Sequence, residues 1–77
     1  MEQKLYVLLS DVLKEPIEHI TDESSPENVK NWDSFNGLVL VDRLEKDFEI
    51  KFTLDEVMDV KNVSDIKRHL RTHGIAI

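Results

Sequence analysis

The stretch Asn31-Trp32-Asp33-Ser34-Phe35 lies near the middle of the 77-residue chain, between a polar segment and the longest amphipathic run of the sequence. Asp and Ser are preferred at helix starts because their oxygens accept hydrogen bonds from the free N–H groups of the first turn. The pair Asp33-Ser34 therefore predicts that a helix begins here. That helix end also favours an anion, since its N–H groups are unpaired and the helix dipole is positive there. A phosphate ester on Ser34 would suit this position, although an Asp-Ser pair alone marks nothing more than a helix start.

From Ser34 to about Phe48, apolar residues recur at the helical spacing of about 100° per residue. One face of this helix is predicted to enter the core: Gly37, Leu40, Val41, Leu44 and Phe48. Phe35 and Val39 are expected on the opposite face, where an exposed apolar pair beside Ser34 indicates a docking patch with an acidic rim. The predicted docking residues are Phe35, Val39, Asp42, Glu45 and Lys46. An ordinary solvated face is the alternative interpretation of the charged residues.

An earlier helix is predicted from five apolar residues that share one face: Leu5, Leu8, Leu9, Val12 and Leu13. Because proline lacks an N–H and disfavours helix in the residue before it, Pro16 predicts that this helix ends near Lys14 or Glu15. A long polar loop then runs from Ile17 to Asn31. Three apolar loop residues are expected to contact the core: Ile17, Ile20 and Val29.

Two more helices are predicted after the amphipathic one. The stretch Thr53-Leu54-Asp55-Glu56 matches a capping box, which predicts a short third helix from Leu54 to Asp59. Asn62 or Ser64 can cap a final helix. The predicted fold is therefore all-α, a four-helix bundle with a long loop between helices one and two and a short third helix. A chain of 77 residues is one domain at most, so we expect a single domain over residues 1–77.

The composition narrows the classes of function. Lys plus Arg is 10 and Asp plus Glu is 16, and the resulting net charge of −6 argues against binding to a nucleic-acid backbone. The chain has no cysteine, which excludes a thiolate metal site and a cysteine nucleophile. No apolar run reaches the roughly 20 residues of a membrane span. We expect a monomeric cytoplasmic protein whose partners bring Lys and Arg to its acidic part.

Two catalytic or metal-binding interpretations fail on their spacing. His69 and His73 lie four residues apart, but no third ligand is evident nearby and no His-Glu-x-x-His motif is present, so we predict surface histidines. Ser34 lacks the Gly-x-Ser-x-Gly motif of a hydrolase nucleophile. The sequence therefore predicts neither a metal centre nor an enzyme, and Ser34 would be modified rather than catalytic.

The order of elements, together with Asp33-Ser34-Phe35 at the start of the second helix, resembles the acyl carrier protein family over nearly the whole chain. The resemblance implies that Ser34 carries a covalent 4'-phosphopantetheine arm, derived from coenzyme A, whose thiol holds cargo as a thioester. Asp33 and Phe35 would flank the attachment site and contact the phosphopantetheinyl transferase. The further partners implied are enzymes that load and accept acyl groups through basic or apolar docking patches.

Departures from the usual pattern of fatty-acid carriers suggest a specialised stand-alone carrier. Trp32 stands where a small residue is common, and Phe35 stands where leucine is usual. Asn36 and Val39 occupy positions that are often acidic in those carriers. A lipid, polysaccharide or secondary-metabolite pathway would fit, and a peptidyl or aminoacyl carrier is an alternative. The alternative from another class is an unmodified helical interaction module.

Overall fold

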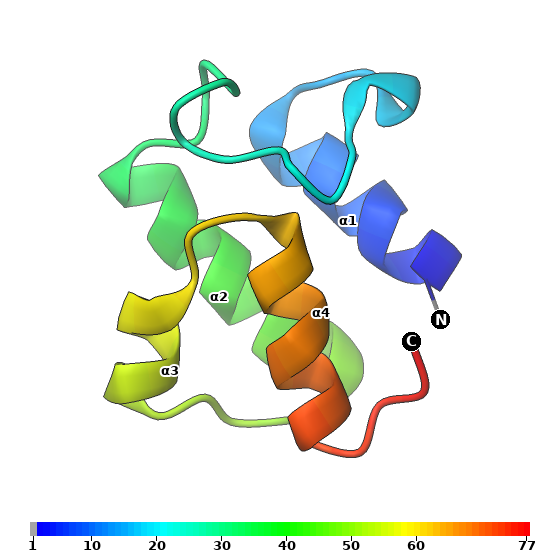
Figure 1. Cartoon of the computed structure of the whole chain (residues 1–77), viewed down its shortest axis with the longest axis vertical. Helices are drawn as coiled ribbons and strands as arrows, with labels where there is room; N and C mark the ends of the chain where they lie inside the picture. The colour runs from blue at the N-terminus through cyan, green and yellow to red at the C-terminus, as the bar shows by residue number, and fades with distance from the viewer. Residues whose placement is uncertain (1) are drawn as a thin grey trace.

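Four α-helices form the part of the chain that the computed structural model describes, residues 2–77, and no strand is present among these residues (Figure 1). In chain order the elements are α1 (Glu2–Leu13), a 3-10 turn η1 (Ile17–His19), α2 (Ser34–Phe48), α3 (Leu54–Asp59) and α4 (Val63–Thr72). The prediction of an all-α fold with a long first loop and a short third helix is confirmed. α1 packs against α2, and in Figure 1 α4 overlies part of α2 with α3 to its left.

The core is built from the apolar faces of the three longer helices. α1 contributes Leu5, Leu8, Leu9, Val12 and Leu13, α2 contributes Leu40, Leu44 and Phe48, and α4 contributes Val63, Ile66 and Leu70. Each fully buried side chain of this size stabilises the fold by about 1.5–3 kcal/mol relative to an exposed one. Gly37 and Val41, predicted for the same face of α2, are only half-buried because a cavity lies beside them.

The helix ends follow the sequence signals. α1 ends at Leu13, and the next residue, Lys14, takes a left-handed conformation with φ 55° just before Pro16. Thr53 and Glu56 form the predicted capping box of α3, with each side chain accepting a hydrogen bond from the other residue's N–H. Asn62, one of the two predicted candidates, caps α4 through the N–H of Asp65.

The loop between α1 and α2 is tied to the bundle by apolar contacts and by hydrogen bonds. Ile20 and Val29 are buried as predicted, whereas Ile17 is 38% exposed and does not hold the loop. The loop carbonyls of Asp22 and Ser24 accept hydrogen bonds from the first N–H groups of α4, which would otherwise be unpaired. The loop therefore covers the start of α4 and delivers the chain to the start of α2.

Lys67 joins three segments that are distant in the sequence. Its Nζ lies 2.6 Å from the Oε2 atom of Glu2 in α1 and 2.6 Å from the Oδ1 atom of Asp22 in the loop, and 4.9 Å from the centre of the Tyr6 ring. Burial lowers the pKa of the Lys67 ammonium, but the hydrogen bonds to Asp22 and Glu2 outweigh burial, so its pKa is raised. Lys67 is therefore charged at any physiological pH and links α4 to α1 and the loop.

We predict that Lys67→Met lowers the free energy of unfolding by about 1–3 kcal/mol, because two charge-assisted hydrogen bonds are lost while the exposed carboxylates regain water. Urea denaturation measures the difference. Lys61→Met is the matched control, since Lys61 is exposed, and we expect it to change stability by no more than about 0.5 kcal/mol. Equal losses in the two variants would contradict a structural role for the Lys67 cluster.

Candidate functional site

Ser34 is exposed and is the first residue of α2. Asp33 caps the helix, since its Oδ1 accepts a hydrogen bond from the Asn36 N–H at 2.8 Å. The Asn36 side chain in turn donates to the Asn31 carbonyl at 2.7 Å and holds the chain before the helix. The N–H groups of Ser34 and Phe35 have no acceptor within residues 2–77, as expected in a first turn. The serine hydroxyl therefore lies beside two free N–H donors.

A cavity of about 170 Å³ lies next to Ser34 between α2, α3 and α4. Its lining includes Trp32 and Gly37 near the start of α2, Leu44 further along α2, Val57 of α3 and Ile66 of α4. Ser34 itself is part of the wall, and the remaining lining side chains are apolar apart from the Trp32 indole N–H. Such a cavity suits an apolar group that reaches it from Ser34.

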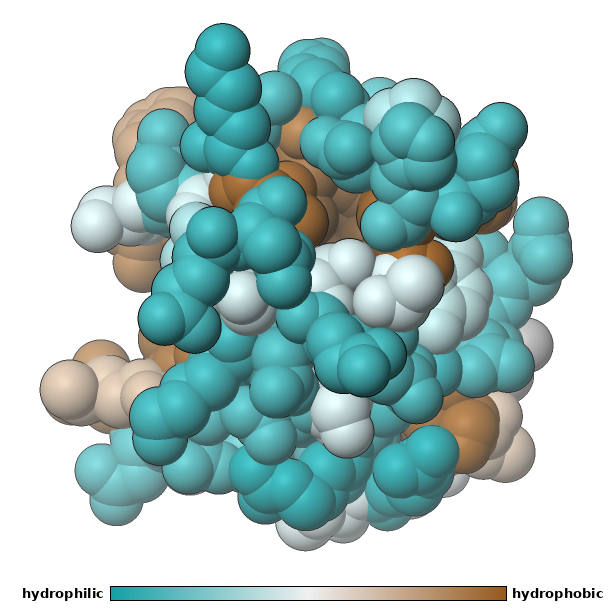
Figure 2. Space-filling view, turned by 45° about the horizontal axis from the view of Figure 1, so that its top comes forward, coloured by the Kyte–Doolittle hydropathy of each residue, from teal (hydrophilic) through white to brown (hydrophobic). Residues whose placement is uncertain are grey.

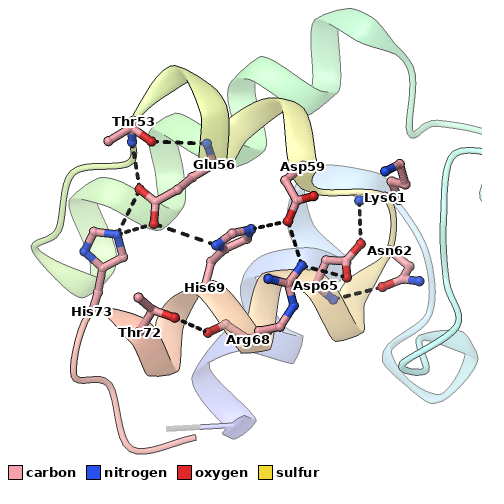
Figure 3. A network of polar contacts seen from close by, with 10 residues as sticks. All are labelled: Thr53, Glu56, Asp59, Lys61, Asn62, Asp65, Arg68, His69, Thr72 and His73. Carbon is pink, nitrogen blue, oxygen red and sulfur yellow. Dashed lines mark hydrogen bonds and ion pairs between the residues drawn. The ribbon is translucent and has the colours of Figure 1, made fainter.

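A polar network holds α3, one wall of the cavity, against α4 (Figure 3). Glu56 Oε2 lies 2.9 Å from His73 Nε2 and 3.7 Å from His69 Nδ1. On its other side, the His69 ring meets Asp59 Oδ2 at 3.0 Å, and Asp59 also accepts a hydrogen bond from Arg68 at 2.7 Å. Glu56 and Asp59 of α3 therefore each contact at least one histidine near α4.

The position of His69 corrects the prediction of two surface histidines. Only 7% of His69 is exposed, because it lies between the carboxylates of α3 and packs edge-on against Phe52. The sequence interpretation found no acidic partner, since Glu56 and Asp59 belong to a different helix and come near only through the fold. No group of three or more potential metal ligands occurs in residues 2–77.

The comparison with known families now bears on this geometry. The chain matches the family described as "Phosphopantetheine attachment site" over residues 3–70, from α1 almost to the end of α4. It belongs to this family. A search of the curated proteins finds no match.

Family membership confirms the predicted cofactor, a covalently bound 4'-phosphopantetheine. The members of this phosphopantetheine family are carriers and not catalysts, and a phosphopantetheinyl transferase modifies them. The chain itself has no cysteine. No helix within residues 2–77 is long and apolar enough to cross a membrane.

The exposed face of α2 in this carrier differs from the predicted one at Leu38, Val39 and Glu45. Phe35 is 73% exposed as predicted, and its neighbour on the surface is Leu38, which is 65% exposed. Val39 is half-buried and packs against the core, so its predicted exposure is wrong. The reason is that α1 packs against this flank of α2. Arg43 lies one turn after Val39, and its guanidinium is 2.8 Å from the carboxylate of Asp11 in α1.

The other predicted docking residues lie at or near the surface of α2. Asp42 and Lys46 are exposed and form an ion pair at 3.0 Å. Glu45 is half-buried, and its Oε2 accepts the N–H of Phe52 at 2.8 Å. Figure 2 shows a mostly hydrophilic face with apolar side chains emerging at the left, the side on which α2 begins and α3 lies in Figure 1. Leu54 and Met58 of α3 are also exposed, each by 72%.

The network gives the stability of α3 a pH dependence. The backbone N–H of Thr53 and the His73 ring hold the pKa of Glu56 below its usual value of 4.5. Arg68 does the same for Asp59, whose usual pKa is 3.8. A carboxyl whose pKa is lower in the folded state stabilises the fold above its unfolded pKa and ceases to do so as the pH falls through its folded pKa. Acid therefore weakens the hold of α4 on α3.

We predict that Glu56→Gln lowers the melting temperature at neutral pH and reduces the loss of stability as the pH falls below 4.5, because the variant has no carboxylate to protonate. Thermal melts followed by circular dichroism across this range measure both effects. Glu27→Gln is the control, since the exposed Glu27 side chain forms no ion pair within the described residues. A Glu56→Gln profile parallel to that of the parent protein would refute the proposed source of the acid sensitivity.

Proposed function

We propose that this protein is an acyl carrier protein that holds acyl intermediates as thioesters on a 4'-phosphopantetheine arm attached to Ser34. The observation that carries the proposal is the position of Ser34 at the first turn of α2, exposed, beside two free N–H groups and on the wall of an apolar cavity. A phosphodiester at this helix end gains about 0.3–1 kcal/mol from the dipole.

The other serines support the choice of Ser34. Ser24 and Ser25 are buried, and the Ser10 hydroxyl is half-buried and donates to the Glu15 carbonyl at 2.6 Å. Ser64 is exposed near the start of α4, but its N–H is used by the Asp22 carbonyl and it lines no part of the cavity. Ser34 therefore combines an accessible hydroxyl, free N–H groups and an adjacent apolar space.

In attachment, the Ser34 oxygen forms a bond to the phosphorus that carries pantetheine in coenzyme A. The bond between the two phosphates of coenzyme A breaks, adenosine 3',5'-bisphosphate leaves, and the serine proton is lost to the transferase. The carrier itself then breaks no bond. Its arm keeps the cargo at a high local concentration near each docked enzyme, and the cavity can shelter an apolar part of that cargo.

The proposed docking surface consists of the exposed and half-buried residues at the start of α2 and along it beside Ser34: Asp33, Phe35, Leu38, Asp42, Glu45 and Lys46. Leu38 replaces Val39 in this set because Val39 packs inward. The mixture of two large apolar side chains with carboxylates fits partner enzymes that present an apolar recess edged by Lys or Arg. We propose acyl-loading and acyl-accepting enzymes of a lipid, polysaccharide or secondary-metabolite pathway as these partners.

The apolar lining of the cavity favours an acyl cargo over the peptidyl or aminoacyl alternative. A charged or strongly polar cargo would lose its water in this space without gaining hydrogen bonds, at a cost of about 1–3 kcal/mol for each unpaired group. Membership of a phosphopantetheine-bearing family argues against the unmodified interaction module.

We predict that incubation with coenzyme A, magnesium and a broad-specificity phosphopantetheinyl transferase adds one phosphopantetheine, and that Ser34→Ala abolishes the addition while the helical circular dichroism spectrum persists. Intact mass spectrometry with peptide mapping measures the modification. Ser64→Ala is the matched control and should be modified like the parent protein, because it removes the other exposed serine. Modification of the Ser34→Ala variant would refute the assignment.

We predict that Phe35→Ala and Leu38→Ala reduce the kcat/KM of the transferase by about tenfold or more, since truncating a large side chain at the centre of an interface can cost about 2 kcal/mol. Their melting temperatures should change little because both side chains are exposed. Val39→Ala is the converse control and should lose about 1 kcal/mol of stability with an unchanged kcat/KM. The opposite pattern would place the docking surface on the flank of Val39.

A further inference from the structure

Trp32, the single tryptophan of the chain, lies two residues before Ser34 and is only 6% exposed. Its ring forms part of the cavity wall together with Ser34 and Gly37. The backbone holds it in place, because the Trp32 N–H donates to the Val29 carbonyl at 3.1 Å and the next residue caps α2. The ring is therefore a fixed part of the cavity wall.

The volume of the cavity limits what can enter. An apolar cavity of about 150 Å³ in a protein interior holds one benzene molecule. The cavity here is about 170 Å³. It therefore accommodates an apolar group of about six carbons, and the Trp32 ring occupies space that a smaller residue would leave to the cargo.

The indole N–H of Trp32 has no acceptor among residues 2–77. Yet every fully buried side-chain nitrogen and oxygen of these residues has a hydrogen-bond partner. The indole nitrogen is consequently not sealed inside the core, and it faces the space next to Gly37, where an added Cβ would lie 3.9 Å from it. Because the indole nitrogen is accessible, an oxygen of an entering group can reach it and accept its hydrogen bond.

We propose that Trp32 is a specificity-determining residue of the carrier. Its ring limits the sheltered part of the cargo to about six carbons, and its indole N–H donates a hydrogen bond to the thioester carbonyl oxygen at the mouth of the cavity. This proposal rests on the carrier function proposed for Ser34, and it identifies the cargo class as short apolar acyl groups.

The experiment loads the protein with acetyl, butyryl, hexanoyl, octanoyl or dodecanoyl phosphopantetheine and confirms each product by intact mass. Melting temperature is measured for each, together with the emission of Trp32, which no other tryptophan obscures. We expect the melting temperature to rise from acetyl to hexanoyl and to rise no further for longer chains. The emission of Trp32 should shift over the same range, because burial of cargo against the indole changes its surroundings.

Two variants should change, in opposite directions, the longest acyl chain that still raises the melting temperature. Trp32→Phe shortens the wall, so octanoyl should stabilise the protein more than hexanoyl does. Gly37→Ala adds a methyl group beside the indole at an ordinary contact distance, so butyryl should already give the full rise. Gly37→Ala also favours the helix and therefore tests the proposal even if Trp32→Phe fails to fold. Lys51→Ala, exposed between α2 and α3 and outside both the cavity lining and the docking surface, is the control and should keep the hexanoyl limit.

The hydrogen bond is tested with a hexyl thioether arm, which has the same length but no carbonyl. The hexanoyl thioester should raise the melting temperature of the parent protein more than the thioether does, and Trp32→Phe should remove this difference. Loaded protein whose melting temperature and emission do not depend on chain length would overturn the role of Trp32 and leave the carrier function standing. The role of Trp32 would also be overturned if Gly37→Ala and Trp32→Phe both kept the chain-length limit of the parent protein. Absence of any modification at Ser34 would instead refute the carrier function itself.

Discussion

The capped start of α2 is the constraint on which the rest of the structure depends. The carboxylate of Asp33 holds the first turn through Asn36, and the Asn36 side chain fixes the preceding backbone at the Asn31 carbonyl. Between these contacts the buried Trp32 anchors the segment in the core. Because the chain is fixed on both sides of Ser34, the hydroxyl is presented at a defined place, next to free N–H groups and the cavity. Few other local arrangements would keep all three features together.

The short helix α3 illustrates how a weak element can be held in place. A helix of six residues has little stability of its own, since nucleation of a helix is costly and few hydrogen bonds follow. Here the capping box fixes its start, and the contacts of Glu56 and Asp59 with α4 fix its position (Figure 3). α3 has no fully buried side chain, so these polar contacts hold it where apolar burial holds α1, α2 and α4.

The charged side chains fall into two groups, those that can meet partner proteins and those that hold the fold together. The acidic side chains near Ser34 remain exposed or half-buried, where they can meet the basic groups of partners. The buried cation, Lys67, instead pairs with Glu2 of α1 and Asp22 of the loop. A net charge of −6 on a small domain produces self-repulsion, and the internal pairing of Lys67 with two carboxylates offsets part of it.

The sequence by itself determined where the helices lie, because helix ends and helix faces depend on neighbours in the chain, and its resemblance to a family predicted the phosphopantetheine. Caps at Asp33, Thr53 and Asn62, and the periodic leucines, act within a few residues of each element they define. Only the tertiary structure decided which residues of those helices meet water. Val39 packs inward because α1 covers its flank, while Leu38 is left exposed, and His69 is buried because α3 brings two carboxylates to it. Trp32 stood out in the sequence as a departure from the family pattern, but its place in the cavity wall depends on α3 and α4 closing the other side. Burial and contact between helices are set by how the elements pack, and no single helix's pattern contains that information.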